Sequence, residues 1–387
     1  MKKGKILYIR NAPFDINPNS YNVQEMGLGK AFCKLGYDFD CVAYKKNDQK
    51  QWVFYENGDC VAKWIETPRI RIFRWGINRN LCRKSFIGQY DIVITSEYME
   101  IMTYLLTKSC TNLYMYSGPY YNLFTFKWFS PIYDLLFTRQ INEVVKVKFV
   151  KSVLAKEYLE KKGYNNVVVT GVGLDFDKFQ TGQQMELETQ QLVDYMTKYK
   201  CLLYVGALSD RKNLPFMLEV YEKVLEKDPD IRFVMIGKSV INPIYKLLGK
   251  KDEDYERVCF SKVSQRAKDG ILRVNYLSNT QLCFIYPLAG AFLLPSKKEI
   301  FGMVLLESMY LGAPVITSKN GGSVTLIKDN DCGIVVDTFD SDKWAEAALE
   351  LVNNPSMAKE LSERAHNKTL LYFNWDYIAK KMESYFM

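Results

Sequence analysis

Residues 290–317 read GAFLLPSKKEIFGMVLLESMYLGAPVIT, and this stretch indicates the fold of the chain. The apolar run Gly290–Pro295 is typical of a buried strand, and Pro314–Thr317 begins a second strand after Leu311–Ala313 ends the helix between them. A strand, a helix and a second strand in this order are typical of a parallel sheet covered by helices. The stretch therefore predicts an α/β fold.

Two carboxylates in this stretch are candidates for binding a ligand. Glu299 should lie on the turn that leaves the first strand, and Glu307 about one turn inside the helix that follows. The helix start at Gly302–Val304 offers unpaired N–H groups and a positive dipole end, which suit phosphate. Because carboxylates beside a phosphate would repel it, these two are better suited to accept hydrogen bonds from hydroxyls. A sugar carrying a diphosphate meets both demands, although the macrodipole alone also favours glutamate near a helix start.

Length and composition predict two domains of ordinary size. The chain has 387 residues, of which 48% are hydrophobic and 25% charged, and its longest apolar stretch is broken by Pro287 and Gly290. We therefore expect no transmembrane helix. Nine scattered cysteines without a CxxC pair argue against a disulfide framework and for a reducing cytoplasm. His366 is the single histidine, so the sequence predicts no metal site and no cofactor.

Positive charge is concentrated in the first half of the chain. Residues 1–180 hold 26 Lys and Arg against 17 Asp and Glu, whereas the remainder holds 26 against 27. Residues 63–84 carry seven basic residues and one acid, and residues 119–137 are rich in aromatics. Basic residues interleaved with aromatics are typical of an anionic membrane surface, although these aromatics would equally fill a core. No recognised motif supports nucleic-acid binding, and we predict none.

A second turn of complementary chemistry follows the predicted strand 201–205. Residues 206–215 read GALSDRKNLP and lead into the predicted helix 214–227, so that Arg211 and Lys212 stand beside a helix start. There they could clamp a diphosphate through charge-assisted hydrogen bonds, and a solvated basic turn is the alternative. Ligands of open α/β sheets bind at the carboxyl ends of the strands, so we expect the site in the cleft between two such domains.

Both halves alternate short β-rich runs with longer amphipathic stretches, which predicts two parallel sheets. A polar stretch at residues 181–200 is the expected linker region, and residues 24–35 are the expected first helix. The expected strands are 5–9, 39–43, 92–95, 112–116, 146–150 and 167–170 in the first half, and 201–205, 232–236, 272–274, 291–294, 314–317 and 333–336 in the second.

The second half resembles the retaining glycosyltransferases of the GT-B fold known as family 4, or glycosyl transferases group 1. The resemblance rests on GALSDRKNLPFMLEV at 206–220, VMIGKS at 234–239, the run 286–322 that ends in SKNGG, and FNWDYIAKKM at 373–382. It covers nearly all of residues 200–387 and is diffuse over residues 1–180, where TGVGLDFDKF at 170–179 matches best.

The resemblance implies two Rossmann-like domains that face a central cleft. Residues 1–185 would form an N-terminal acceptor-binding domain and residues 186–370 a C-terminal domain that binds a nucleotide-sugar donor. Residues 371–387 would form a helix that crosses back to pack on the N-terminal domain.

The resemblance also implies roles for the residues of the two turns. Arg211 and Lys212 would bind the donor diphosphate and neutralise the leaving group. Glu299 would contact hydroxyls of the transferred sugar and Glu307 would hold the ribose. The implied catalytic residues are therefore Glu299, Arg211 and Lys212, and the implied donor-binding residues are Gly206, Phe301, Gly302, Met303, Val304 and Glu307.

The first half departs from the family pattern at two places. The first turn after a strand lacks the usual Gly-Gly pair and offers Asn19 and Ser20 instead. Where many members carry a histidine near the sugar, this chain has Ser117, and Glu97 follows the preceding strand. These four residues are our candidates for acceptor or sugar contacts.

We therefore expect a retaining glycosyltransferase that moves a hexose from a UDP- or GDP-sugar to a saccharide acceptor, without a metal. The expected acceptor is a lipid-linked or surface-polysaccharide precursor, and the expected location is the cytoplasm or the inner face of the membrane. Two alternatives stay open: a catalytically silent homologue that is the partner or chaperone of another glycosyltransferase, and a sugar-nucleotide epimerase of the same fold.

Overall fold

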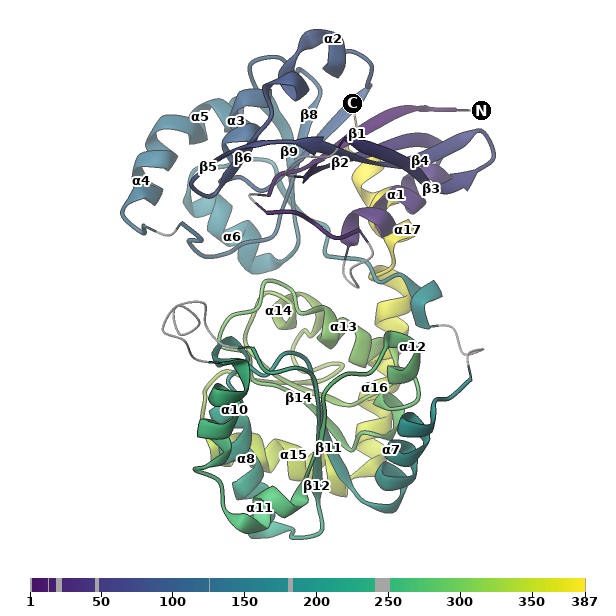
Figure 1. Ribbon diagram of the computed structural model, residues 1–387, viewed down its shortest axis with the longest axis vertical. Coiled ribbons are helices and arrows are strands. Elements are labelled where there is room, and N and C mark those ends of the chain that lie inside the picture. The colour runs from purple at the N-terminus through teal and green to yellow at the C-terminus, as the bar shows by residue number, and fades with distance from the viewer. Residues whose placement is uncertain are drawn as a thin grey trace. The chain divides into compact units, whose positions relative to one another are not determined.

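The chain is built on two large β-sheets, each with helices packed against it, in a computed structural model (Figure 1). The structure describes residues 2–12, 14–18, 23–45, 49–124, 126–179, 184–240 and 251–386, apart from the side chains of residues 252 and 253. Unit 1 comprises Met1–Leu174 and Tyr372–Met387, and unit 2 comprises Asp175–Leu371. The structure confirms the predicted α/β fold, and the chain first passes from unit 1 to unit 2 earlier than the boundary expected after residue 185.

Unit 1 is built on a sheet in which all neighbouring strands are parallel except β3 and β4. The order across the sheet is β10-β9-β8-β7-β1-β2-β4-β3, and a separate hairpin is formed by β5 and β6. The strands are β1 (Gly4–Arg10), β2 (Tyr37–Lys45), β3 (Lys50–Asn57), β4 (Cys60–Pro68), β5 (Ile70–Ile72), β6 (Trp75–Ile77), β7 (Ile92–Ser96), β8 (Leu113–Ser117), β9 (Val145–Val150) and β10 (Val167–Val169).

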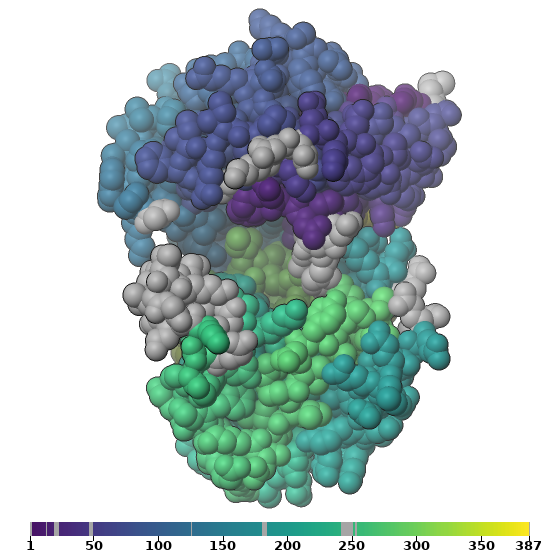
Figure 2. Space-filling model, in the orientation of Figure 1, coloured from purple at the N-terminus to yellow at the C-terminus, as the bar shows by residue number. Residues whose placement is uncertain are grey.

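The helices of unit 1 connect these strands. Figure 2 shows that the first part of the chain, in purple and blue, makes up most of the visible surface of this unit. The helices are α1 (Gln24–Lys34), η1 (Arg79–Cys82), α2 (Lys84–Ile87), α3 (Ile101–Leu106), α4 (Phe129–Tyr133), a π-helical turn η2 (Asp134–Thr138), α5 (Arg139–Val144), α6 (Val153–Lys161) and α17 (Trp375–Glu383).

The centre of the unit 1 sheet follows from its sequence. Strands β7 and β8 are buried along their whole length, as expected for parallel strands that are covered on both faces. Strands β3 and β4, which form an antiparallel pair at the edge, were not predicted from the sequence. Burial alternates along most of β4, and the partly exposed positions include charged residues such as Lys63, which obscured the strand pattern.

Unit 2 is built on a sheet of parallel strands in the order β13-β12-β11-β14-β15-β16. Its strands are β11 (Cys201–Val205), β12 (Arg232–Ile236), β13 (Ile271–Val274), β14 (Ala291–Leu294), β15 (Val315–Ser318) and β16 (Ile334–Val336). Its helices are η3 (Phe176–Phe179), α7 (Leu187–Lys198), η4 (Asp210–Lys212), α8 (Leu214–Lys227), α10 (Asp252–Phe260), α11 (Gln265–Gly270), α12 (Asn279–Leu282), η5 (Tyr286–Leu288), α13 (Met303–Tyr310), α14 (Ser323–Leu326), α15 (Ser341–Asn353) and α16 (Pro355–Tyr372).

The last helix returns to unit 1 and packs on α1, as predicted. Asn374 caps α17 by accepting a hydrogen bond from the Tyr377 N–H at 2.6 Å, and the residues that α17 buries recur at helical spacing. Trp375 fits against α1 because residue 27 is glycine: a Cβ there would lie 2.2 Å from the indole ring. The absence of a side chain at Gly27 therefore permits the contact between α1 and α17.

Within the residues that the structure describes, no helix is both long enough and apolar enough to span a bilayer.

Trp375→Ala should destabilise unit 1, because it removes a ring that is 6% exposed and leaves a cavity beside Gly27. We expect the free energy of unfolding to fall by ~3–5 kcal/mol. Urea unfolding followed by circular dichroism measures the change. The matched control is Lys380→Ala on the exposed side of α17, for which we expect a change within about 0.5 kcal/mol. Equal losses in the two variants would contradict the packing role of Trp375.

Candidate functional site

Two turns of unit 2 lie side by side because the strands that they follow are neighbours. Strands β11 and β14 pair in parallel, so the turns at 206–212 and 295–302 leave the same edge of the sheet. The Lys297 N–H donates a hydrogen bond of 3.0 Å to the Arg211 carbonyl, which joins the two turns directly. The parallel sheet therefore brings together the two turns that the sequence analysis selected.

Arg211, Lys212 and Glu299 form an ion cluster at this edge. One oxygen of Glu299, Oε2, accepts hydrogen bonds from Arg211 at 2.8 Å and from Lys212 Nζ at 2.5 Å. The side chains of Lys212 and Glu299 are largely buried, whereas that of Arg211 is 51% exposed. The predicted cations and the predicted carboxylate thus pair with one another in the structure, and Arg211 presents the exposed part of the cluster.

The cluster fixes the charge of Glu299. Burial acts to raise the pKa of this carboxyl, but the two cations and their hydrogen bonds outweigh burial and hold the pKa below its ordinary value. Burial also lowers the pKa of the Lys212 ammonium, and the attraction of Glu299 opposes that shift. Glu299 therefore stays ionised at neutral pH.

Glu307 has the opposite environment. It lies on α13, is 1% exposed, and neither of its carboxylate oxygens has a hydrogen-bond partner among the described residues. Burial raises the pKa of this carboxyl to about 8. A buried polar group without partners costs free energy, so such a group in a folded protein requires an explanation. Two neighbouring hydroxyls of a ligand would supply the missing hydrogen bonds.

The start of α13 lies between these two carboxylates. Gly302 precedes the helix in a left-handed conformation with φ of 79°, which disfavours any residue with a side chain. Phe301 is buried, whereas Met303 and Val304 are partly exposed. The first N–H groups of a helix have no partner within it, so the predicted backbone donors lie at an end suited to an anion. The N–H of Gly206, by contrast, already has a partner, because it donates a hydrogen bond of 2.9 Å to the Ile236 carbonyl within the sheet.

A third turn, after β15, supports the Glu299 turn and was not selected from the sequence. Asn320 is fully buried, and its side-chain oxygen accepts hydrogen bonds from the N–H groups of Gly322 and Ser323. The Gly321 N–H donates to the Glu299 carbonyl at 3.1 Å. The SKNGG motif thus holds the Glu299 turn in place. Its asparagine and two glycines are the residues from which this turn could have been predicted.

In unit 1 the structure brings Glu97 and Ser117 together. Glu97 follows β7 with φ of 63°, an uncommon conformation for a residue with a side chain. Its carboxylate accepts hydrogen bonds of 3.1 Å from the Ser117 hydroxyl and from the Gly118 N–H. The other two candidates of this half, Asn19 and Ser20, lie outside the described residues.

Lys151 is a charged residue of unit 1 that the sequence analysis did not select. It follows β9 at the same edge of the sheet as Glu97, is 7% exposed, and lies 5.1 Å from the centroid of the Tyr116 ring. Within the described residues no carboxylate lies at ion-pair distance from its ammonium, and burial lowers its pKa. In a sequence, a single lysine after a strand looks like an ordinary surface lysine, so nothing in the sequence indicated that Lys151 is buried.

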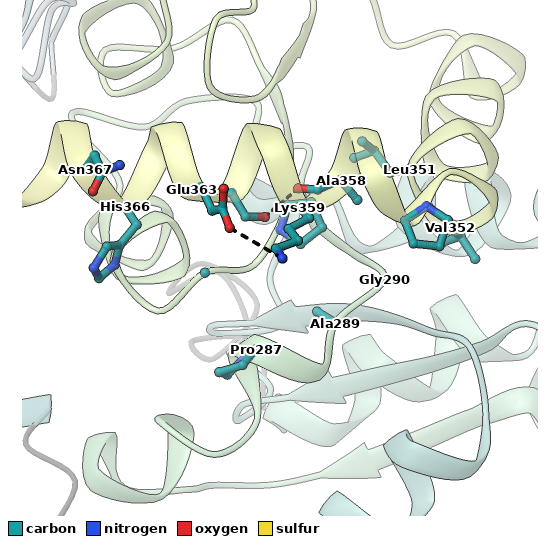
Figure 3. Close-up of a pocket in the computed structure, with 14 residues that line it drawn as sticks. Pro287, Ala289, Gly290, Leu351, Val352, Ala358, Lys359, Glu363, His366 and Asn367 are labelled. Atoms are coloured by element: carbon teal, nitrogen blue, oxygen red, sulfur yellow. Dashed lines mark hydrogen bonds and ion pairs between the residues drawn. The ribbon is translucent and has the colours of Figure 1, made fainter.

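Unit 2 also contains a cavity of about 510 Å³ beneath α16 (Figure 3). Lys359 and Glu363, which pair at 3.8 Å, project from α16 toward the segment that includes Ala289 and Gly290. That segment precedes β14, whereas Glu299 follows it. The cavity therefore lies at the opposite end of the strand from the ion cluster and is not part of the candidate site.

Comparison with known proteins finds one matching family and several relatives. Residues 188–368 match the family described as Glycosyl transferases group 1. A D-inositol 3-phosphate glycosyltransferase of Corynebacterium urealyticum is 26% identical over 57% of this chain and 52% of its own length. The chain thus spans about half the length of the curated relatives that it matches.

Solved structures share the fold. Sucrose-phosphate synthase from Thermosynechococcus elongatus is similar with a TM-score of 0.68 at 17% identity, and Anabaena HepE in complex with UDP and glucose with a TM-score of 0.65 at 12% identity. Each alignment covers 98% of both chains. These structures have low sequence identity to the chain, and they confirm the GT-B fold that the resemblance implied.

Glu307 should make the ligand-free protein less stable as pH rises. Its carboxyl ionises near pH 4.5 in the unfolded chain but near 8 in the folded chain, so between these values the unfolded state binds fewer protons. The free energy of unfolding should then fall with pH by at most ~1.4 kcal/mol per unit relative to Glu307→Gln.

Thermal unfolding across this pH range, followed by circular dichroism, measures the difference. Glu363→Gln, at a carboxylate that is 64% exposed on α16, is the control and should follow the wild-type curve. Parallel curves for wild type and Glu307→Gln would show that the Glu307 carboxyl is not perturbed.

Proposed function

We propose that this chain, whose residues 188–368 belong to the Glycosyl transferases group 1 family, transfers a hexose from a nucleotide-diphosphate sugar to a saccharide acceptor with retention of configuration. The observation that carries the proposal is the buried carboxyl of Glu307, which lacks a partner within the described residues and lies one helical turn beyond a helix start. A ribose has the adjacent hydroxyls that this carboxyl needs, and a diphosphate has the charge that the helix start favours.

The donor would be held by three kinds of contact. The diphosphate would lie at the start of α13, where Arg211 and Lys212 supply positive charge. Arg211 has five N–H donors and is half exposed, so it can bind phosphate while it keeps its hydrogen bond to Glu299. Glu299, held ionised by the two cations, would accept hydrogen bonds from hydroxyls of the transferred sugar.

The reaction would need no nucleophile from the protein. The acceptor hydroxyl attacks the anomeric carbon from the side that the diphosphate leaves, the bond from that carbon to the phosphate oxygen breaks, and a phosphate oxygen takes the hydroxyl proton. Arg211 and Lys212 stabilise the charge that develops on the leaving diphosphate, which is the role that a metal fills in other enzymes. Pre-organised charge in a largely buried cluster costs little reorganisation during the reaction.

The acceptor side belongs to unit 1 in this proposal. Glu97 and Ser117 would contact the acceptor or the transferred sugar. Lys151 is buried and has no carboxylate at ion-pair distance within the described residues, so it suits an anionic group of the acceptor. A saccharide on a lipid phosphate, such as a polyprenyl-linked precursor of a surface polysaccharide, has such a group.

Donor binding should release a proton from Glu307. At pH 7 a carboxyl with a pKa of about 8 is mostly protonated, whereas hydrogen bonds from ribose hydroxyls favour the charged form. We expect a release of ~0.9 proton per donor bound in the wild type and none in Glu307→Gln.

Thermal shift with UDP-, GDP- and ADP-hexoses first selects the donor, and calorimetry in buffers of different ionisation enthalpy then counts the protons. If none of these nucleotide sugars binds, the proposed function is wrong. If one binds equally well to both proteins without proton release, the role of Glu307 is wrong.

Arg211→Ala should weaken donor binding, because it removes a charge-assisted hydrogen bond to phosphate. We expect the dissociation constant of the selected donor to rise ~10- to 100-fold. Lys343→Ala, at an exposed lysine of α15, is the control and should bind like the wild type. Donor hydrolysis and transfer to membrane glycan extracts should fall with Arg211→Ala as well. Wild-type affinity in that variant would contradict the phosphate role of Arg211.

A further inference from the structure

Unit 1 exposes large apolar side chains on two segments that share a cavity. Phe73, at the tip of the β5–β6 hairpin, is 82% exposed, and Trp128, just before α4, is 65% exposed. Ile132, Leu135 and Leu136 continue the exposed surface along the helix that begins at Phe129. Their spacing of three and four residues places them on one side of that helix, and Tyr133 beside them is buried. Apolar residues on the exposed face of a surface helix indicate an interaction site.

The cavity that joins the two segments is aromatic and has a volume of about 570 Å³. Phe73 and Trp75 line it from the hairpin, and Phe126 and Trp128 line it from the facing segment. Phe124, Phe129, Arg71 and Arg74 complete the lining. A cavity of this size and composition would accommodate a hydrocarbon chain with an anionic group at its mouth.

Phe73 is also strained. Ile72 pairs with Trp75, so Phe73 and Arg74 form the two-residue turn of the hairpin, and Phe73 adopts φ of 50°. Glycine or asparagine usually occupies such a position, because a bulky side chain there is unfavourable. A phenylalanine with a strained backbone and a side chain that is 82% exposed points to a function outside the fold.

The charges around the cavity favour an anion. The Arg74 guanidinium lies 5.4 Å from the centroid of the Phe124 ring and donates a hydrogen bond to the Leu123 carbonyl, while its buried Nε has no partner among the described residues. The acidic group near it, Glu100, lies 3.8 Å away, and burial raises the pKa of that carboxyl to about 8. At neutral pH Arg74 is therefore incompletely neutralised. Arg71 and Lys127 are exposed on the same two segments, and Arg139, which pairs with Glu143 at 2.8 Å, is exposed just beyond them at the start of α5.

We propose that these two segments dock on a bilayer that contains anionic phospholipid, with an acyl chain in the aromatic cavity and a lipid phosphate at Arg71 and Arg74. Phe73, Trp128 and Leu135 enter the interface between headgroups and chains, where aromatic and aliphatic side chains are favoured. Lys127 and Arg139 meet further headgroups. A second copy of this chain is a poorer occupant, because a two-fold contact would bring the same arginines and lysines of both copies together. The docking does not depend on the proposed sugar transfer.

Flotation with vesicles tests the docking. The full chain should bind vesicles of equal parts phosphatidylglycerol and phosphatidylcholine, bind pure phosphatidylcholine weakly, and lose binding as salt is raised. The double variant Phe73→Ser with Trp128→Ser should lower the affinity for the anionic vesicles by about tenfold or more. The matched control is Leu187→Ser with Tyr276→Ser, which removes side chains of unit 2 that are 76% and 65% exposed and should leave binding unchanged.

A fluorescence measurement keeps the test valid if the double variant folds poorly. Vesicles with brominated acyl chains should quench the tryptophan emission of the wild type, and the milder Trp128→Phe should reduce that quenching to the share that Trp75 in the same cavity contributes. Equal quenching in Trp128→Phe, equal loss of binding in the control, or equal binding to pure phosphatidylcholine would overturn the proposal.

Two further readouts distinguish lipid docking from a contact between copies of the chain and from a role in donor binding. Light scattering would overturn the proposal if the double variant changed a dimer into a monomer and kept vesicle binding, because the surface would then be an interface between copies. Donor affinity should be unchanged in the double variant. Loss of donor binding without loss of vesicle binding would likewise overturn the assignment of these residues to the lipid.

Discussion

Because β11, β14 and β15 pair in parallel, the turns that leave them meet at one edge of the sheet, and the candidate donor site depends on this constraint. The first turn supplies Arg211 and Lys212, the second supplies Glu299, and the third fixes the Glu299 backbone through the Gly321 N–H. None of these turns alone would hold a largely buried carboxylate in its charged form. The sheet therefore positions both the ions and the helix start without help from a ligand.

Glu299 and Glu307 belong to the same strand–turn–helix segment, yet their environments have opposite consequences. Two cations offset the burial of Glu299 and hold its pKa low, whereas burial alone acts on Glu307 and raises its pKa to about 8. The first carboxylate has a fixed charge before any ligand arrives. The second can gain its charge when hydroxyls reach it. A sugar diphosphate would thus meet one group that is already organised and one that responds to binding.

The sequence predicted the unit 2 sheet more fully than the site or unit 1. Apolar runs bounded by turn residues located β11, β12 and β14 at their observed positions, since a parallel strand buried on both faces is read from composition. The sequence placed Arg211 and Lys212 beside a helix start, but it did not show that both pair with Glu299, because that contact joins two turns that are far apart in the chain. Among the aromatic residues of 119–137, Tyr133 is fully buried and Trp128 is exposed. The sequence could not show which of them are buried, because burial depends on tertiary packing. Lys151 was missed for the same reason.

The most direct test of the central claim, that Glu307 accepts hydrogen bonds from a ribose, compares a nucleoside diphosphate with its 2′,3′-dideoxy analogue. Affinities of both ligands for the wild type and for Glu307→Ala form a thermodynamic cycle, measured by calorimetry with whichever of UDP and GDP binds better. We predict a coupling free energy of ~1.5–3 kcal/mol, with the wild type distinguishing the two ligands and the variant binding both alike. If the wild type bound the dideoxy analogue as tightly as the natural nucleotide, the assignment of Glu307 to the ribose would be contradicted.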